Sequence, residues 1–176
     1  MNRLKKLLKI DNEYKTFRLI VDKCGLLADF DNLTKEMEVM HKARHSRNLA
    51  TKTPSVDKLI KAAAQASAYR SRVVEIMVNV QKAQRTLSSA IERMEAHILT
   101  NYKMHITGRS INDRKLEVKN VLDKAYSKLS DFDRIVDMCK EFIADIESFG
   151  WMARLQMQGL DLIYTRENIV SSKLTR

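Results

Sequence analysis

Residues 56–102 read VDKLIKAAAQASAYRSRVVEIMVNVQKAQRTLSSAIERMEAHILTNY and contain neither Gly nor Pro. An apolar residue recurs every three or four positions, which is the spacing of one face of a long helix. Such a helix would extend about 70 Å at ~1.5 Å per residue, so other helices must cover its apolar face. The recurring positions are Leu59, Ala63, Ala66, Val73, Met77, Val80, Leu87, Ile91, Met94 and Ile98.

A second stripe with the same period follows a turn predicted over residues 101–113. The spacing predicts another long helix from Asp113 to about Phe149, which Gly150 interrupts or bends before a last helix that frays from Asn168. Two long helices joined by one turn lie antiparallel over an apolar seam. The stripe comprises Val118, Leu122, Ala125, Leu129, Phe132, Val136, Cys139, Ile143 and Ile146.

Composition supports the same fold class. The 176 residues include only 4 Gly and 1 Pro, which excludes a turn-rich β fold, and 9 Met, which suit helix packing. We therefore expect an all-α protein whose long antiparallel helices form a helical hairpin or bundle, with an N-terminal helical extension. The extension, residues 1–53, is predicted to hold two helices joined near Gly25 and to end in a linker over Ser46–Thr53.

Charge divides the chain into three segments. The net charge of +10 is made up of +5 over residues 1–54, +6 over 55–115 and −1 over 116–176. A long basic surface attracts polyanions, of which nucleic acid is the most common, and phosphate contacts carry no sequence information. Residues 54–115 are thus predicted to bind single-stranded DNA, and 116–176 to form an acidic helix and a C-terminal oligomerisation helix. The acidic face meets either solvent or the basic face of a neighbouring chain.

The predicted nucleic-acid contacts are the Lys and Arg residues of the long helix and its turn. Of the aromatic residues near this surface, Tyr69 and Tyr102 are expected to pack inside the protein. The apolar residues of the last helix are expected to anchor contacts between subunits. The predicted DNA-binding residues are Lys58, Lys61, Arg70, Arg72, Lys82, Arg85, Arg93, Lys103, Arg109, Arg114 and Lys115, and the predicted oligomer interface is Trp151, Leu155, Leu162 and Ile163.

No motif for catalysis or cofactor binding is recognisable. The sequence lacks a Gly-rich phosphate loop, a paired-Cys metal motif and a nucleophile elbow, so we expect no enzyme, no cofactor and no metal site. His41 and His45 can share a helix face, but no carboxylate or Cys nearby completes a metal site. Cys24 and Cys139 are expected to be reduced, buried thiols. With no membrane-spanning run or signal peptide, the chain is expected to be cytoplasmic.

Several short motifs occur in an order that resembles the T4-type phage recombination mediator (UvsY-like) family, over roughly residues 55–164. The family has an apolar-Asp-Phe-Cys run with a Gly-aromatic pair beyond it, a Lys-x-Glu-x-Lys-x-Val-Leu segment, and a Ser-Gly-Arg turn. Residues 1–53 have no counterpart, and the family's Lys-x-Arg pair late in its first long helix is absent. The matching stretches here are Val136–Cys139, Gly150-Trp151, Lys115–Leu122, Thr107–Arg109 and Asp57–Tyr69.

The resemblance implies an accessory protein of phage homologous recombination that forms rings. Such a mediator binds single-stranded DNA, displaces or weakens the single-strand-binding protein and helps to load the recombinase, with its C-terminal helices assembling the homo-oligomer. Two alternatives stay open from the residues alone. One is a helical structural or scaffolding protein without DNA affinity. The other is an adaptor that docks on an acidic protein through residues 1–53.

Overall fold

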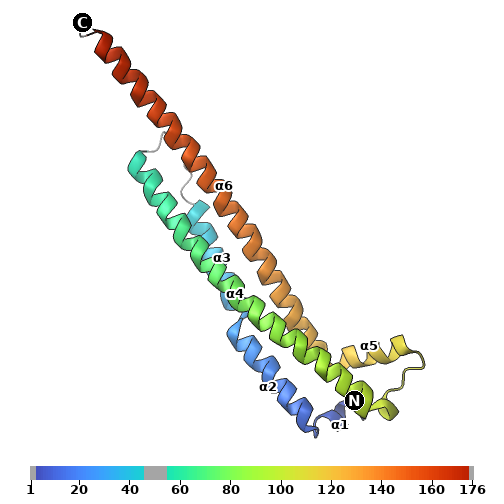
Figure 1. The fold of residues 1–176 in the computed structure, drawn as a ribbon. Coiled ribbons are helices and arrows are strands. Elements are labelled where there is room, and N and C mark those ends of the chain that lie inside the picture. Colours follow the sequence, from blue (N-terminus) through green and yellow to red (C-terminus); the bar gives the residue numbers. More distant parts are fainter. Residues whose placement is uncertain (1–2, 46–54, 175–176) are drawn as a thin grey trace. The chain divides into compact units, whose positions relative to one another are not determined.

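The computed structural model describes the backbone of residues 3–45 and 55–174, and the side chains of residues 4–43 and 55–167. Within these ranges every regular element is helical, so the predicted all-α class is confirmed (Figure 1). The predicted linker over Ser46–Thr53 lies outside the described residues. The α-helices are α1 (Arg3–Leu8), α2 (Asn12–Leu27), α3 (Phe30–His45), α4 (Val56–Asn101), α5 (Ile111–Val121) and α6 (Asp123–Leu174), and a 3-10 turn, η2, spans Lys103–His105.

The chain divides into two compact units. The first unit comprises Met1–Lys35 and Ile76–Met138, and the second comprises Glu36–Glu75 and Cys139–Arg176. The helices α3, α4 and α6 each contribute to both units. The units therefore cut across the three segments expected from charge and periodicity, residues 1–53, 54–115 and 116–176.

In the first unit, α4 and α6 run antiparallel. Gln84 of α4 donates to Asp133 of α6 over 2.5 Å, and Tyr126 of α6 donates to Glu95 of α4 over 2.6 Å, so the numbers rise along one helix and fall along the other. The helical hairpin predicted from the two stripes is present. The side chains of both stripes that fill this core are at most 6% exposed: Val80, Leu87, Ile91, Met94, Ile98, Val118, Leu122, Ala125, Phe132 and Val136.

The N-terminal helices pack on this core rather than standing apart from it. Leu4 and Leu8 of α1 are fully buried, and Phe17, Val21 and Cys24 form the buried face of α2. Asp11 caps α2 by accepting a hydrogen bond from the Tyr14 N–H. The helices α1 and α2 of the predicted extension are thus part of the first unit's core, whereas α3 continues into the second unit.

The second unit has a separate core, to which three helices contribute. Its α3 side chains are Met37 and Met40, and the Cys139 thiol of α6 lies 3.9 Å from the Met37 sulfur. The other buried residues are Leu59, Ala62, Ala66 and Val73 from α4 and Phe142, Ile146 and Ala153 from α6. Small side chains on α4 let the neighbouring helices approach closely.

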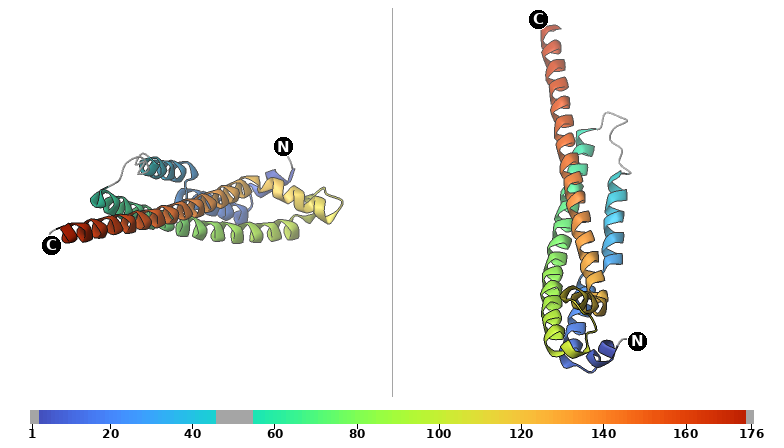
Figure 2. Two further views of the ribbon diagram at one scale, coloured as in Figure 1. Left: turned by 90° about the horizontal axis from the view of Figure 1, so that it is seen from above. Right: turned by 90° about the vertical axis from the view of Figure 1, so that its right-hand side faces the viewer.

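Three predicted boundaries were wrong in the C-terminal half. The helix α6 continues through Gly150 and Gly159 to Leu174, so Gly150 does not interrupt it and the helical backbone extends past Asn168. Figure 2 shows this long C-terminal helix. The break lies instead at Leu122, whose backbone (φ −93°, ψ 11°) leaves the helical region between α5 and α6. Val121 and Leu122 are both buried. A single glycine costs a helix only about 1 kcal/mol relative to Ala, which the neighbouring turns of α6 tolerate.

Two N-terminal boundaries also differ from the prediction. The extension holds three helices instead of two, and Gly25 lies inside α2. A side chain at Gly25 would collide with the Lys128 side chain, whose ammonium group donates to the Val21 carbonyl over 3.3 Å. Asp29 caps the start of α3 by accepting hydrogen bonds from the backbone N–H groups of Asp31 and Asn32.

Candidate nucleic-acid interface

The predicted DNA-binding residues fall into two groups, because the two units divide α4 between Glu75 and Ile76. Four of them belong to the second unit and seven to the first. The second-unit group is Lys58, Lys61, Arg70 and Arg72, and the first-unit group is Lys82, Arg85, Arg93, Lys103, Arg109, Arg114 and Lys115.

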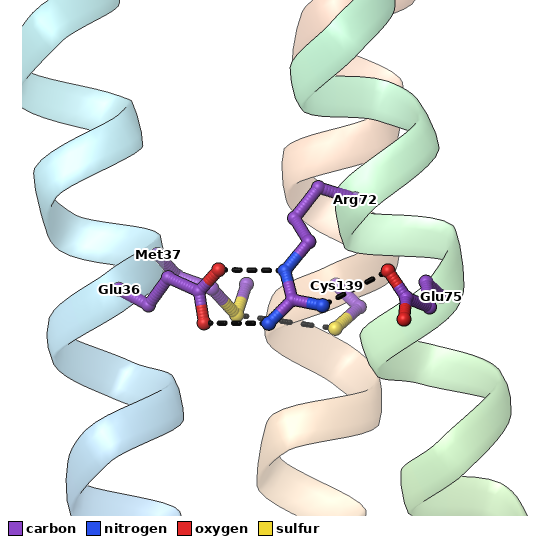
Figure 3. Close-up of polar contacts among 5 residues, drawn as sticks. All are labelled: Glu36, Met37, Arg72, Glu75 and Cys139. Carbon is purple, nitrogen blue, oxygen red and sulfur yellow. Dashed lines mark hydrogen bonds and ion pairs between the residues drawn. The ribbon is translucent and has the colours of Figure 1, made fainter.

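Arg72 is held between two carboxylates (Figure 3). Its guanidinium donates to both Glu36 oxygens over 2.7 and 3.1 Å and to Glu75 over 2.9 Å. The hydrogen bond from Arg72 holds the pKa of Glu36 below its usual value, and those to Glu36 and Glu75 raise the pKa of Arg72. The two-point pair with Glu36 occupies guanidinium N–H groups that would otherwise donate to a phosphate. Arg72 therefore links α3 to α4.

Arg70 is also engaged within the second unit. Its guanidinium donates to Glu147 of α6 over 2.9 and 3.3 Å, and both side chains are about half exposed. Glu147, an acidic residue of the second long helix, thus pairs with a basic residue of its own chain. Lys58 and Lys61 are exposed and form no ion pair with any residue in the described ranges. The second unit therefore keeps two unpaired lysines from the predicted surface.

In the first unit, most of the predicted cations stay exposed. Lys82, Arg85 and Arg93 lie on α4 and make no ion pair with the residues the structure describes. We call these three residues the cationic row. They lie at intervals of three and eight residues, so they extend along the surface of α4 rather than around it. Lys103 and Arg109 are exposed at the turn between α4 and α5, and Lys115 is exposed on α5.

The turn itself is rigidly built. Arg114 is half-buried and donates to the Gly108 carbonyl over 3.0 Å, so it shapes the turn. A Cβ atom at Gly108 would lie 2.6 Å from the Arg114 backbone nitrogen, which explains the glycine. Ser110 and Asp113 form a reciprocal capping box at the start of α5, and their hydrogen bonds lower the pKa of Asp113. Thr107 donates twice to Glu117, over 2.8 and 3.0 Å.

The two tyrosines near the predicted surface have structural partners, as expected. The Tyr102 hydroxyl donates to Asp11 over 2.5 Å, and the Tyr69 hydroxyl accepts from Gln65 over 2.6 Å. The hydrogen bond to Asp11, together with burial, raises the pKa of Tyr102. Both side chains are partly buried.

The predicted oligomer-interface residues lie on the part of α6 in the second unit. Trp151, Leu155, Leu162 and Ile163 are between 47% and 71% exposed. Two neighbours that the sequence argument did not select, Met152 and Tyr164, are 55% and 59% exposed. In the sequence, only their positions next to Trp151 and Ile163 indicated that they belong to this apolar surface. This stretch presents more apolar surface than a solvated helix ordinarily does.

Sequence reasoning did not find a groove between α2 and α4 in the first unit. It has a volume of about 340 Å³ and is lined by side chains of both helices. No sequence signal pointed to it, because pairing of α2 with the C-terminal half of α4 depends on tertiary packing. The lining residues are Glu13, Thr16, Phe17 and Ile20 from α2 and Thr86, Ser89, Ala90, Arg93, Met94 and His97 from α4.

The chemistry of the described residues offers no metal centre. No three His, Cys, Asp or Glu side chains within the described ranges lie close enough to hold an ion. His41 lies against the Phe142 ring at 5.9 Å, and the side chain of His45 is outside the described residues. Among the helices that the structure describes, none combines the length and apolar character needed to cross a lipid bilayer.

The sequence matches no known family model, and neither the curated proteins nor the solved structures include one that it matches.

Proposed function

We propose that this chain binds single-stranded DNA without sequence preference and acts as a phage recombination mediator. It assembles into a homo-oligomer, weakens or displaces the single-strand-binding protein and helps to load the recombinase. The observation that carries the proposal is the cationic row of α4, which is exposed and unpaired among the described residues. Lys103 and Arg109 at the turn and Lys115 on α5 add to it. The resemblance over residues 55–164 supplies the mediator role.

Three of the predicted DNA-binding arginines already have partners within the protein, so the binding surface that we propose is smaller than the predicted one. Arg70 and Arg72 would have to leave carboxylate partners before contacting phosphate, and Arg114 would have to release the turn. We therefore assign DNA contact to the unpaired cations, with the cationic row as the principal surface. If six phosphates are neutralised, the log–log salt slope is about −4 for a single strand.

Fluorescence polarisation with labelled oligonucleotides tests this proposal. Single-stranded and duplex oligomers of equal length are compared over a salt series, with the wild type and the variant K82E/R85E. Loss of two phosphate contacts should flatten the slope by about 1.4 and lower affinity roughly ten- to a hundredfold. The matched control K23E/K124E changes net charge equally at exposed lysines of the first unit outside the row, and it should lower affinity far less.

Two results would reject the surface or the function. Equal losses in K82E/R85E and K23E/K124E would mean that net charge alone governs binding and that the row is not a site. Absence of binding by the wild type at 0.1–0.15 M salt would favour the structural or scaffolding alternative, which predicts assembly without DNA affinity.

Oligomer formation through α6 is the second part of the proposal, supported by the exposed Trp151, Leu155, Leu162 and Ile163. Light scattering coupled to gel filtration should show an assembly for the wild type and smaller species for W151E/L162E. A control substitution at an exposed polar site on the part of α6 in the first unit, Ser130→Glu, should leave the assembly intact. A wild type that is monomeric at micromolar concentration would contradict this part.

A further inference from the structure

The groove between α2 and α4 of the first unit has an apolar floor and a polar rim. Phe17, Ala90 and Met94 form its floor and are each 8% exposed or less. A volume of about 340 Å³ lies at the lower end of the range for small-molecule sites. The groove is open on one side, so it suits part of a larger ligand better than an enclosed molecule.

The rim offers hydroxyl groups rather than a fixed pattern of charge. Thr16 and Thr86 donate to backbone carbonyls of their own helices over 3.0 and 2.9 Å, which leaves their oxygens as acceptors. Ser89 is exposed and makes no side-chain hydrogen bond to a described residue, so its hydroxyl can donate or accept. Such groups can hydrogen-bond to varied heterocyclic edges without selecting one.

The groove opens beside the cationic row. Ser89 lies four residues after Arg85 and four before Arg93, so the three side chains share one face of α4. Arg93 belongs to both the row and the groove lining. A ligand that has a flat apolar part and an anionic backbone can therefore place its apolar part in the groove and its backbone along the cationic row.

We propose that the groove accepts one unstacked base of a single strand whose phosphates lie along Lys82, Arg85 and Arg93. This inference rests on the proposed DNA-binding function and adds the place where a base is held. Base contact with apolar side chains is tolerant of sequence because every base has an apolar face. The groove thus takes the role that aromatic platforms have in other single-strand binders.

One charge on the rim opposes an anionic ligand. Glu13 of α2 is exposed and lines the groove. His97 lies at the same end, with its Nε2 atom 3.0 Å from the Asp11 carboxylate. Removing the Glu13 charge by E13Q should strengthen binding of a normal strand about twofold, which is the scale of an exposed charge near a phosphate.

The test compares an oligothymidylate with an abasic oligomer of the same length and charge. The wild type should bind the oligothymidylate roughly fivefold or more tightly than the abasic strand. In S89L the larger side chain occupies the groove, so this preference should fall toward unity while affinity for the abasic strand and the salt slope stay unchanged. The control S71L makes the same substitution at an exposed site on α4 in the second unit, and it should keep the full preference.

The results of this test distinguish the groove site from the proposed DNA-binding function. Loss of the base preference in S89L alone supports the groove site. Equal binding of both strands by the wild type overturns the groove site and leaves DNA binding standing. A preference that survives in S89L, or falls equally in S71L, also overturns it. No binding of either strand at 0.1 M salt removes the proposed function, and the inference with it.

Discussion

Replacing Asp11 by Ala should be among the most costly single changes in the first unit. The Asp11 side chain is only 11% exposed and accepts three hydrogen bonds. The Tyr14 N–H lies 3.0 Å from the carboxylate at the start of α2. The His97 Nε2 atom of α4 lies 3.0 Å from it, and the hydroxyl of Tyr102, which follows the end of α4, lies 2.5 Å from it. One carboxylate thus caps α2 and joins it to the end of α4.

The expected cost follows from these three contacts. An N-cap contributes about 1 kcal/mol, and each hydrogen bond to a charged acceptor contributes about 1.5 kcal/mol at the lower end of its range. Asp11→Ala should therefore lower the free energy of unfolding by about 4 kcal/mol. Asn retains the cap and a neutral acceptor, so Asp11→Asn should cost about half as much.

The effect should also depend on pH. Burial raises the pKa of Asp11, but hydrogen bonds from Tyr102, His97 and the Tyr14 N–H more than offset this and hold that pKa well below its usual range. Because the folded-state pKa is lower than the unfolded one, the stabilisation is fully present above about pH 4 and is lost as the pH falls toward the folded value. The difference between wild type and Asp11→Asn should shrink between pH 5 and pH 2.

Urea unfolding followed by far-ultraviolet circular dichroism measures these differences. Asp22→Ala, an exposed aspartate on the same helix, serves as the control and should change stability by less than about 0.5 kcal/mol. A loss below about 1 kcal/mol for Asp11→Ala would mean that only the cap contributes. Equal losses for the Ala and Asn variants would show that a neutral acceptor at this position retains none of the stabilisation, and either result would refute the argument.

Two further predictions concern α6 and the thiols. Gly150 and Gly159 lie within a continuous helix, with open space where a Cβ would lie. Gly150→Ala and Gly159→Ala should therefore each raise the free energy of unfolding by about 0.5–1 kcal/mol. Thermal melts measure this, and a lowered Tm would contradict an unbroken helix. Burial raises the pKa of both thiols, that of Cys139 to about 11, and both are buried. A thiol-reactive disulfide reagent at pH 8 should label Cys24 and Cys139 only after unfolding in urea, and rapid labelling of the native protein would disprove their burial.

The apolar periodicity predicted most of the buried residues that lie within residues 56–174. Of the first stripe, Leu59, Val73, Val80, Leu87 and Ile98 are fully buried, and the second stripe buries Phe132 and Cys139 to the same degree. Periodicity succeeds here because each helix must bury one continuous face, whichever neighbour covers it. It failed at Gly150 and Leu122, because one glycine is too weak a signal to end a helix, and the break at Leu122 lies at two adjacent buried residues with no Gly or Pro.

Sequence alone determined the helical class, the long hairpin and the positive charge of the first 115 residues, since these depend on local spacing and composition. Tertiary structure decided which cations remain open to a ligand. Arg72 meets Glu36 at a separation of 36 residues and Arg70 meets Glu147 at 77, whereas Lys82, Arg85 and Arg93 meet no carboxylate among the described residues. The groove between α2 and α4 arose in the same way, because ion pairs and grooves depend on which side chains packing brings face to face.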